Sequence, residues 1–326
     1  MIAAYALRLF CLCLASFFVV NAGVGLLVSA ASRAAIRVAE TMQARGAARF
    51  LFLIRILPFA LGMGAVLGLC VPSYLWFEPH ATPERVGLAC LALVGLGAAS
   101  CFVSIARVSR ALVASSRCQQ QWKETGHEDR LPGENARAMV VEKEAPLLAL
   151  AGILQPRLVV SRGVLQALCL DQLDVALRHE NAHRVSRDNL KRLILLAIPG
   201  PILLARRFGT LEEGWAKFAE WAADDEAVQG DSNRAVSLAS ALLRVARMGS
   251  GPRLSFLHTS LVAGDRDLAA RVERLLQFET TIAPARFRAR PLTWGAGFAM
   301  TALIATMLAA PAIFSSVHRL LELFLQ

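Results

Sequence analysis

His179-Glu180-Asn181-Ala182-His183 is an HExxH pattern, from which the rest of the chain can be interpreted. On a helix, residues four apart lie on one face about one turn from each other, so both imidazoles can bind one metal ion. Glu180 lies beside that face, where it can act as a base on a water molecule without binding the metal. Catalytic zinc uses such neutral nitrogen ligands and keeps one coordination position open. The pentapeptide therefore predicts a zinc site on a helix.

A surface helix with two solvated histidines is the alternative explanation. The chain has only 6 His in 326 residues. At that frequency a chance HExxH match is expected in well under about one such chain in a hundred. Leu173, Ala176 and Leu177 precede His179 at spacings typical of an apolar helix face. We therefore expect a helix of roughly 20 residues whose ligand face continues a dry, apolar face.

A small antiparallel sheet is predicted before this helix. Three short apolar runs are bounded by Pro146, Gly152 and Pro156. These runs are 138–141, 147–150 and 157–161. Leu and Ala are poor strand formers, so a helix is an alternative for 147–150. The charged segment 126–133 is predicted to be a loop.

The third metal ligand is predicted on a later helix, at about 211–229. Glu220 and Asp224 lie one turn apart there. A carboxylate completes a His₂Glu site, and a second carboxylate one turn on can accept the free N–H of a ligand histidine. From spacing alone Glu226 is the main rival of Glu220.

The composition indicates a membrane protein. The chain is 56% hydrophobic and only 18% charged, and its mean hydropathy is +0.48. Four stretches hold the roughly 20 apolar residues that cross a bilayer: 3–31, 50–77, 86–106 and 293–315. The first lacks the basic start of a signal peptide, so we expect an uncleaved span. Arg8 and Arg55 lie near span ends, where they are expected to reach toward the membrane surface.

Basic residues beside these spans predict their orientation. Segments 32–49, 107–123 and 286–290 are rich in arginine, whereas the link 78–85 carries one basic residue. The positive-inside rule then puts the N-terminus outside and residues 107–292 in the cytoplasm. The same clusters account for most of the net charge of +10, so nucleic-acid binding is not implied. Three units follow: 1–106 with three spans, 107–292 as the zinc domain, and 293–326 with the fourth span and a short tail.

Two further features bear on the topology. Five of the 7 Cys lie in predicted spans, and none shows metal-ligand spacing. Residues 193–205 are apolar but interrupted by Pro199-Gly200-Pro201. Thirteen residues cannot cross a bilayer. A buried hairpin and a membrane-dipping hairpin are equally compatible with this stretch.

These motifs together resemble the BlaR/MecR-type integral-membrane zinc metallopeptidases, which are gluzincins related to the HtpX/CAAX-protease class. The resemblance covers most of residues 100–280 and, loosely, the four-span layout. Its specific parts are Pro156–Ser161, Leu173–His183, Arg187–Leu190, Glu220–Asp224, Ala241–Arg244 and Arg271–Leu276. It implies a mainly α membrane protein with a cytoplasmic α+β gluzincin-type domain. It also implies a place in the bacterial inner (cytoplasmic) membrane.

By this resemblance His179, His183 and Glu220 are the zinc ligands, Glu180 the catalytic base and Asp224 the partner of a ligand histidine. Several residues depart from the pattern. Cys169 stands where the family usually has a helix-capping Ser or Thr, and a thiol is a poor cap. Val185 and Ser186 replace residues that are often basic, and Ala223 stands where Cys is frequent. The chain ends 11 residues after the fourth span, so we expect no penicillin-binding sensor.

The predicted function is hydrolysis of peptide bonds in a cytoplasmic or membrane-associated protein, such as a transcriptional repressor, as part of regulatory signalling. The substrate is expected to add as a strand along an edge at 157–161. An additional oxyanion donor is expected, with His258 and Arg271 as candidates that structural roles explain better. The alternative is a signal-transducing or assembly protein whose zinc domain is structural. A transporter is disfavoured because the spans show no internal repeats.

Overall fold

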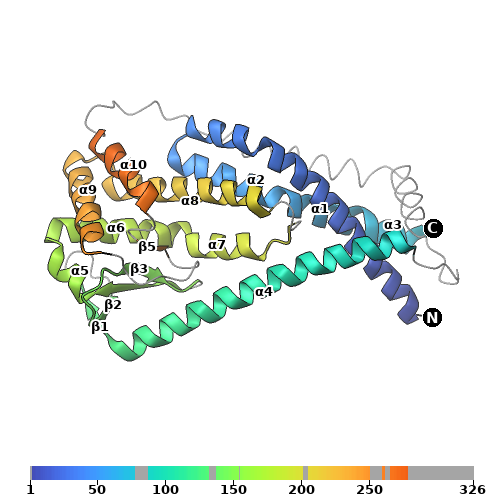
Figure 1. Ribbon diagram of the computed structural model, residues 1–326, viewed down its shortest axis with the longest axis horizontal. Coiled ribbons are helices and arrows are strands. Elements are labelled where there is room, and N and C mark those ends of the chain that lie inside the picture. The colour runs from blue at the N-terminus through green and yellow to red at the C-terminus, as the bar shows by residue number, and fades with distance from the viewer. Residues whose placement is uncertain are drawn as a thin grey trace.

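The computed structural model describes residues 2–77, 87–131, 137–153, 155–200, 205–249, 259–260 and 265–277. It is elongated, with long helices extending from one end and a sheet covered by shorter helices at the other (Figure 1). The predicted fourth span and His258 lie outside the described residues.

Three helices in the described part are long and apolar enough to cross a membrane, at 5–40, 44–76 and 88–125. They correspond to the first three predicted spans. Helix α1 covers Ile2–Glu40, and α2 (Ala44–Ala65) continues through a π-helical turn η1 (Val66–Cys70) into α3 (Val71–Phe77). Pro72 has no N–H to donate within this rod, and the wider turn lies directly before it. Helix α4 (Leu88–Thr125) continues unbroken beyond its apolar part, as expected for 107–127.

A five-stranded mixed sheet follows α4. Its strands are β1 (Gly126–Arg130), β2 (Arg137–Val141), β3 (Leu148–Ala151), β4 (Arg157–Ser161) and β5 (Thr259–Ser260). The strand order is β1-β2-β4-β3-β5. The pair β2–β4 is parallel, and the other pairs are antiparallel. The three predicted strands are confirmed, including 147–150, for which a helix was the alternative.

Three expectations about the sheet are wrong. The sheet is mixed rather than antiparallel, because β4 pairs with β3 on one side and with β2 on the other. For the same reason β4 is not an edge strand, so 157–161 offers no free edge to a peptide. The expected loop at 126–133 contains β1, whose residues after Gly126 are exposed and charged, as is common on edge strands. It lacks the apolar run by which strands are recognised in a sequence.

The sheet is buried on both faces, which explains its continuous apolar strands. One face, with Val140, Leu148 and Val160, packs against the core of helices α6 and α9. The other face, with Met139 and Val159, covers Trp122 at the end of α4. The helices of this region are α5 (Arg162–Ala167), α6 (Leu170–Ser186), α7 (Asp188–Ala197), α8 (Ala205–Val228), α9 (Ser232–Arg247) and α10 (Asp265–Leu276).

The segment that follows α7 is hydrogen-bonded to the long helices α1 and α4. Asn21 of α1 donates a hydrogen bond to the carbonyl of Pro199 at 2.9 Å, and Ser104 of α4 donates one to the carbonyl of Ile198 at 3.3 Å. Ile198 and Pro199 are buried. Polar side chains of two candidate membrane-span helices therefore satisfy two buried backbone carbonyls in the segment that follows α7.

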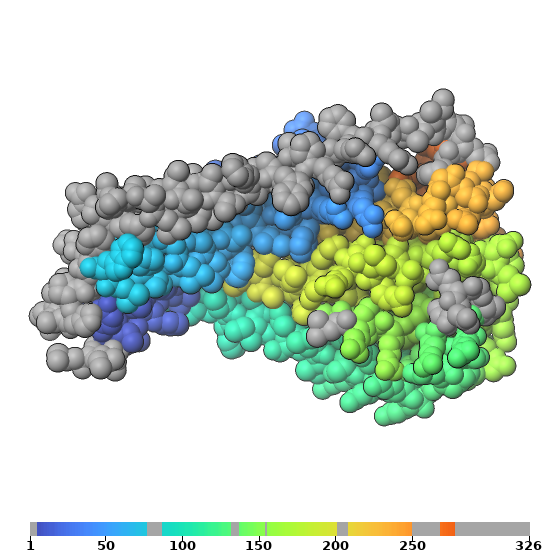
Figure 2. Space-filling model, turned by 180° about the vertical axis from the view of Figure 1, so that it is seen from behind, coloured from blue at the N-terminus to red at the C-terminus, as the bar shows by residue number. Residues whose placement is uncertain are grey.

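Helix α8 lies between α6 and the two long helices α1 and α2. One core cluster joins it to α1 and α2 through Val28, Leu51, Leu211, Trp215 and Phe218. Its other side contacts α6. Figure 2 shows the first contact from behind, where the light-blue surface of α2 meets the yellow-green and yellow surfaces of α7 and α8.

Candidate metal centre

Helix α6 carries the HExxH stretch and runs from Leu170 to Ser186, slightly shorter than predicted. The Gln172 side chain helps to cap the start of the helix, because its Oε1 accepts a hydrogen bond from the backbone N–H of Cys169 at 3.3 Å. The helix ends at Arg187, whose φ of 55° is left-handed and turns the chain sharply into α7. This turn places Asp188, the first residue of α7, beside the end of the metal helix.

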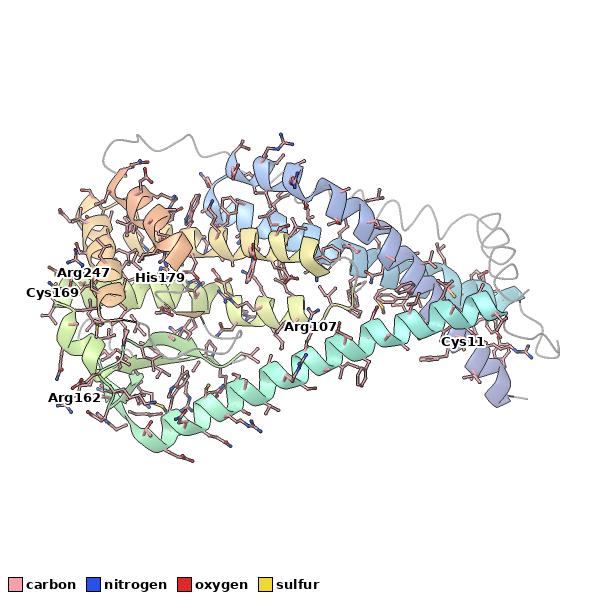
Figure 3. All side chains as sticks on the ribbon, viewed as in Figure 1. Cys11, Arg107, Arg162, Cys169, His179 and Arg247 are labelled. Carbon is pink, nitrogen blue, oxygen red and sulfur yellow. The ribbon has the colours of Figure 1, made fainter. Side chains whose placement is uncertain are left out.

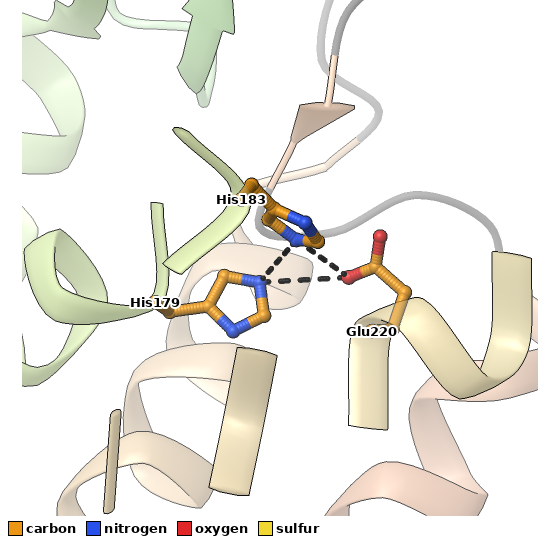
Figure 4. Close-up of side chains that lie close together, drawn as sticks. All are labelled: His179, His183 and Glu220. Atoms are coloured by element: carbon orange, nitrogen blue, oxygen red, sulfur yellow. Dashed lines mark hydrogen bonds and ion pairs between the residues drawn. The ribbon is translucent and has the colours of Figure 1, made fainter. Parts of the chain in front are cut away.

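Three donor atoms converge between α6 and α8 (Figure 4). Nε2 of His179 lies 3.2 Å from Nε2 of His183. Oε2 of Glu220 lies 3.5 Å from Nε2 of His179 and 3.6 Å from Nε2 of His183. All three residues are buried, and one ligand atom from each lies within 4.8 Å of the other two. Two histidines of one helix and a carboxylate of another thus form a candidate site for a metal ion.

Each histidine is oriented from behind by a carboxylate. Nδ1 of His179 lies 2.9 Å from Oδ1 of Asp224, and Nδ1 of His183 lies 2.7 Å from Oδ2 of Asp188. An imidazole that donates its Nδ1–H to a carboxylate presents the lone pair of Nε2 on its opposite side. Both Nε2 atoms are therefore directed as metal ligands require.

Each of these carboxylates has a basic partner. Arg271 of α10 binds both oxygens of Asp224, with Nη2–Oδ1 at 2.7 Å and Nε–Oδ2 at 2.9 Å. Lys191 lies with its Nζ 2.8 Å from Oδ1 of Asp188. The two histidines thus have equivalent supports, each made of one acidic and one basic residue.

Glu180 is fully buried beside the three donors, and neither of its carboxylate oxygens has a hydrogen-bond partner among the described residues. Burial raises the pKa of Glu180 to about 7, although the neighbouring His179 and His183 act in the opposite direction. A buried carboxylate without a partner is unfavourable for folding. It is the feature of this region that structural needs explain least.

The electrostatics of the centre favour a cation. Burial alone would lower the pKa of His183, but Glu220 and Asp188 outweigh it and raise that pKa to about 10. The histidines and Arg271 in turn hold the pKa of Glu220 well below its ordinary value despite burial. Two Nε2 atoms 3.2 Å apart cannot both carry a proton directed at the other. A divalent ion satisfies both lone pairs and the carboxylate at once, so the donor set fits a zinc ion.

Among the predicted site residues, the structure brings together His179, Glu180, His183, Glu220 and Asp224. Glu226, the rival of Glu220, is half-exposed, and its Oε2 lies 3.6 Å from Nη1 of Arg45. Arg271 is not free to act as an oxyanion donor, because it binds Asp224 and its Nη1 lies 3.2 Å from Oε2 of Glu220.

Two residues that complete the centre were missed in the sequence. Asp188 was visible only as part of the Arg187-Asp188-Asn189-Leu190 motif, to which the sequence alone assigns no role in the site. Arg192 approaches from α7, with its Nη2 3.8 Å from Oε1 of Glu220 and its guanidinium 5.8 Å from the Trp215 ring. Neither residue shares a helix with a ligand, so spacing could not reveal them.

No protein-family model matches the chain, and no curated protein matches it.

Proposed function

We propose that this protein is a membrane-bound zinc metallopeptidase that hydrolyses peptide bonds of a cytoplasmic or membrane-associated protein. His179, His183 and Glu220 would hold the ion, and Asp188 and Asp224 would orient the two imidazoles. The observation that carries the proposal is Glu180, whose buried carboxylate oxygens have no hydrogen-bond partner in the described part of the chain. A purely structural zinc site has no use for an unpaired base at this position.

Zinc would supply a Lewis acid that polarises the scissile carbonyl and makes water more acidic. Glu180 would accept a proton from the attacking water and then pass it to the nitrogen of the leaving amine. A pKa near 7 suits both transfers at neutral pH. The centre is buried, which excludes bulk water and strengthens its electrostatic interactions.

A peptide cannot add as a strand along β4, because both edges of β4 are paired. The ligands are nearly inaccessible, with Glu220 the most exposed of the three at 6%. Peptide binding therefore requires a part of the protein to move away from the centre.

The test compares wild-type protein with Glu180→Gln, both purified in detergent. Zinc content is measured by elemental analysis, and proteolysis with quenched-fluorescent casein. We expect both proteins to hold zinc, and the variant to lose cleavage by about 100-fold or more. Glu213→Gln, an exposed carboxylate on α8, is the matched control and should cleave like the wild type. Equal cleavage by Glu180→Gln and the wild type would refute the assigned base.

The second candidate is a signal-transducing or assembly protein with a structural zinc site. The contact of α8 with the membrane helices favours a transducing role. The same experiment separates the two, because zinc retention without any cleavage by the wild type would support the second candidate.

A further inference from the structure

Helix α8 has two different neighbours on its two sides. Glu220 and Asp224 face α6 and its histidines. Leu211, Trp215 and Phe218, at spacings of four and three, pack instead against α1 and α2. Glu220 is the only one of the three candidate ligands that does not belong to α6. Its position relative to the histidines therefore depends on where the membrane helices hold α8.

The contact between α2 and α8 is close. Buried small residues line the α2 side, with Ala44, Ala47 and Ala48 followed by Leu51. On α8 the contact point is Gly214, where an added Cβ would lie 3.3 Å from Cδ1 of Leu51. With small residues at this point the two helices pack closely. A displacement of α2 therefore also displaces α8.

A buried ion pair fixes the two helices along their length. Nε of Arg55 on α2 lies 2.8 Å from Oε1 of Glu212 on α8. The Arg55 guanidinium also lies 4.4 Å from the centre of the Phe208 ring. Arg55 is 4% exposed, so the expectation that it reaches the membrane surface is wrong. A buried charge without its partner is strongly unfavourable, so the pair permits little sliding of α8 along α2.

We propose that Arg55 and Glu212 are positioning residues for the third metal ligand. The inference rests on the proposed zinc site. Glu212 precedes Glu220 by two helical turns, about 12 Å along α8. Zinc–ligand distances vary by only about 0.2 Å. A small shift of α8 against α6 therefore weakens metal binding, and the pair links the metal affinity of the centre to the position of the second membrane helix.

The same two helices supply a matched control. Arg45 of α2 and Glu226 of α8 form a second pair, with Nη1–Oε2 at 3.6 Å. Their side chains are 55% and 48% exposed, compared with 5% and 22% for Arg55 and Glu212. Exposed pairs contribute little because solvent screens them. Arg45→Met thus removes an arginine from the same interface without leaving a buried charge unpaired.

The experiment measures zinc affinity by chelator competition in lipid nanodiscs, at a temperature well below the midpoint of thermal unfolding. The variants are Arg55→Met, Glu212→Gln, the double variant and Arg45→Met. We expect at least 10-fold weaker zinc binding in each of the first two and less than twofold change in Arg45→Met. The double variant should be no weaker than the single ones, because the two residues act through one contact.

Several outcomes would overturn the inference. Affinity unchanged in Arg55→Met and Glu212→Gln, with only a lower unfolding midpoint, would show that the pair merely stabilises the fold. Additive losses in the double variant would show that the residues act separately. If the single variants fail to fold, the double variant, which leaves no unpaired charge, decides by its own zinc affinity. A wild type that binds no zinc would instead refute the proposed function.

Discussion

At the scale of single residues, the candidate centre depends on carboxylates that do not touch the metal position. Asp188 and Asp224 each hold one imidazole with Nε2 toward the other donors, and each is itself paired with a basic residue. An amide in place of either carboxylate can donate to Nδ1 as well as accept from it. It therefore no longer selects the tautomer that ligates through Nε2.

Asp188→Asn is expected to weaken zinc binding by about 10–100-fold, which is typical for the loss of such a partner. Chelator competition on the purified protein measures the effect. Asp174→Asn is the control, because Asp174 lies on the same helix as the histidines and pairs with Arg178 away from the centre. Equal zinc affinity in the two variants would show that Asp188 does not orient His183.

The metal-free protein should lose stability as the pH rises through about 7. Burial raises the pKa of Glu180 from 4.5 to about 7, so the folded state binds this proton more tightly than the unfolded state. The resulting contribution is complete below pH 4.5 and is lost as the pH rises through 7. Its upper limit is about 3 kcal/mol, since one pKa unit corresponds to about 1.4 kcal/mol.

Glu180→Gln isolates this effect, because the amide cannot ionise. After zinc is removed with a chelator, the unfolding temperatures of the variant and the wild type should differ much less at pH 5 than at pH 8. At pH 8 the variant should be the more stable. Thermal midpoints from intrinsic fluorescence at the two pH values provide the measurement, and a constant difference between the proteins would contradict the assignment.

At the scale of elements, the start of α6 is weaker than its importance suggests. Cys169 occupies the N-cap of a capping box, in which its thiol is a poor acceptor for the backbone N–H of Gln172 and the Gln172 side chain accepts from the backbone N–H of Cys169 at 3.3 Å. Cys169 is exposed, so a substitution there disturbs no packing. Cys169→Ser should stabilise the protein by about 0.5–1 kcal/mol, because a hydroxyl accepts the free backbone N–H of the first turn better than a thiol.

Thermal unfolding of Cys169→Ser at constant pH tests this expectation. Asp231 provides the converse case, since its carboxylate already accepts from the N–H groups of Asn233 and Arg234 at the start of α9. Asp231→Ala should therefore lower the unfolding temperature. An unchanged or lower midpoint for Cys169→Ser would mean that a hydroxyl caps the first turn no better than the thiol does.

The elements that the sequence predicts well are those with local signals. His179 and His183 share a helix face because of their spacing, and 157–161 is recognisable as a strand from its apolar residues. Strand β4 lies between β2 and β3, so β2 pairs with a strand that does not follow it directly in the sequence, and no local pattern records this. Arg271 and Asp224 are 47 residues apart, and Arg55 and Glu212 are 157 apart. Such contacts follow from the packing of whole helices, and spacing cannot reveal them.

At the scale of the whole molecule, the candidate centre lies far from the end of α1 that carries Cys11. Figure 3 shows His179 toward one end of the structure and Cys11 toward the other. Helices α1 and α2 extend over this length and end against α8. Helices α1 and α2 therefore pack directly against the helix that carries Glu220.

The charge distribution of the chain predicts an orientation in a membrane. Arg33, Arg37, Arg45 and Arg49 surround the turn between α1 and α2, at the end of the spans nearest the metal centre. The positive-inside rule predicts that this end faces the cytoplasm. Exposed Cys169 should then be protected from a membrane-impermeant maleimide in sealed right-side-out vesicles, whereas a cysteine introduced by Thr82→Cys should react. Cys118→Ser removes the other thiol outside the predicted spans, and detergent provides the control that Cys169 can react. Labelling of Cys169 in sealed vesicles would place the centre on the opposite side, and a cytoplasmic substrate would then be untenable.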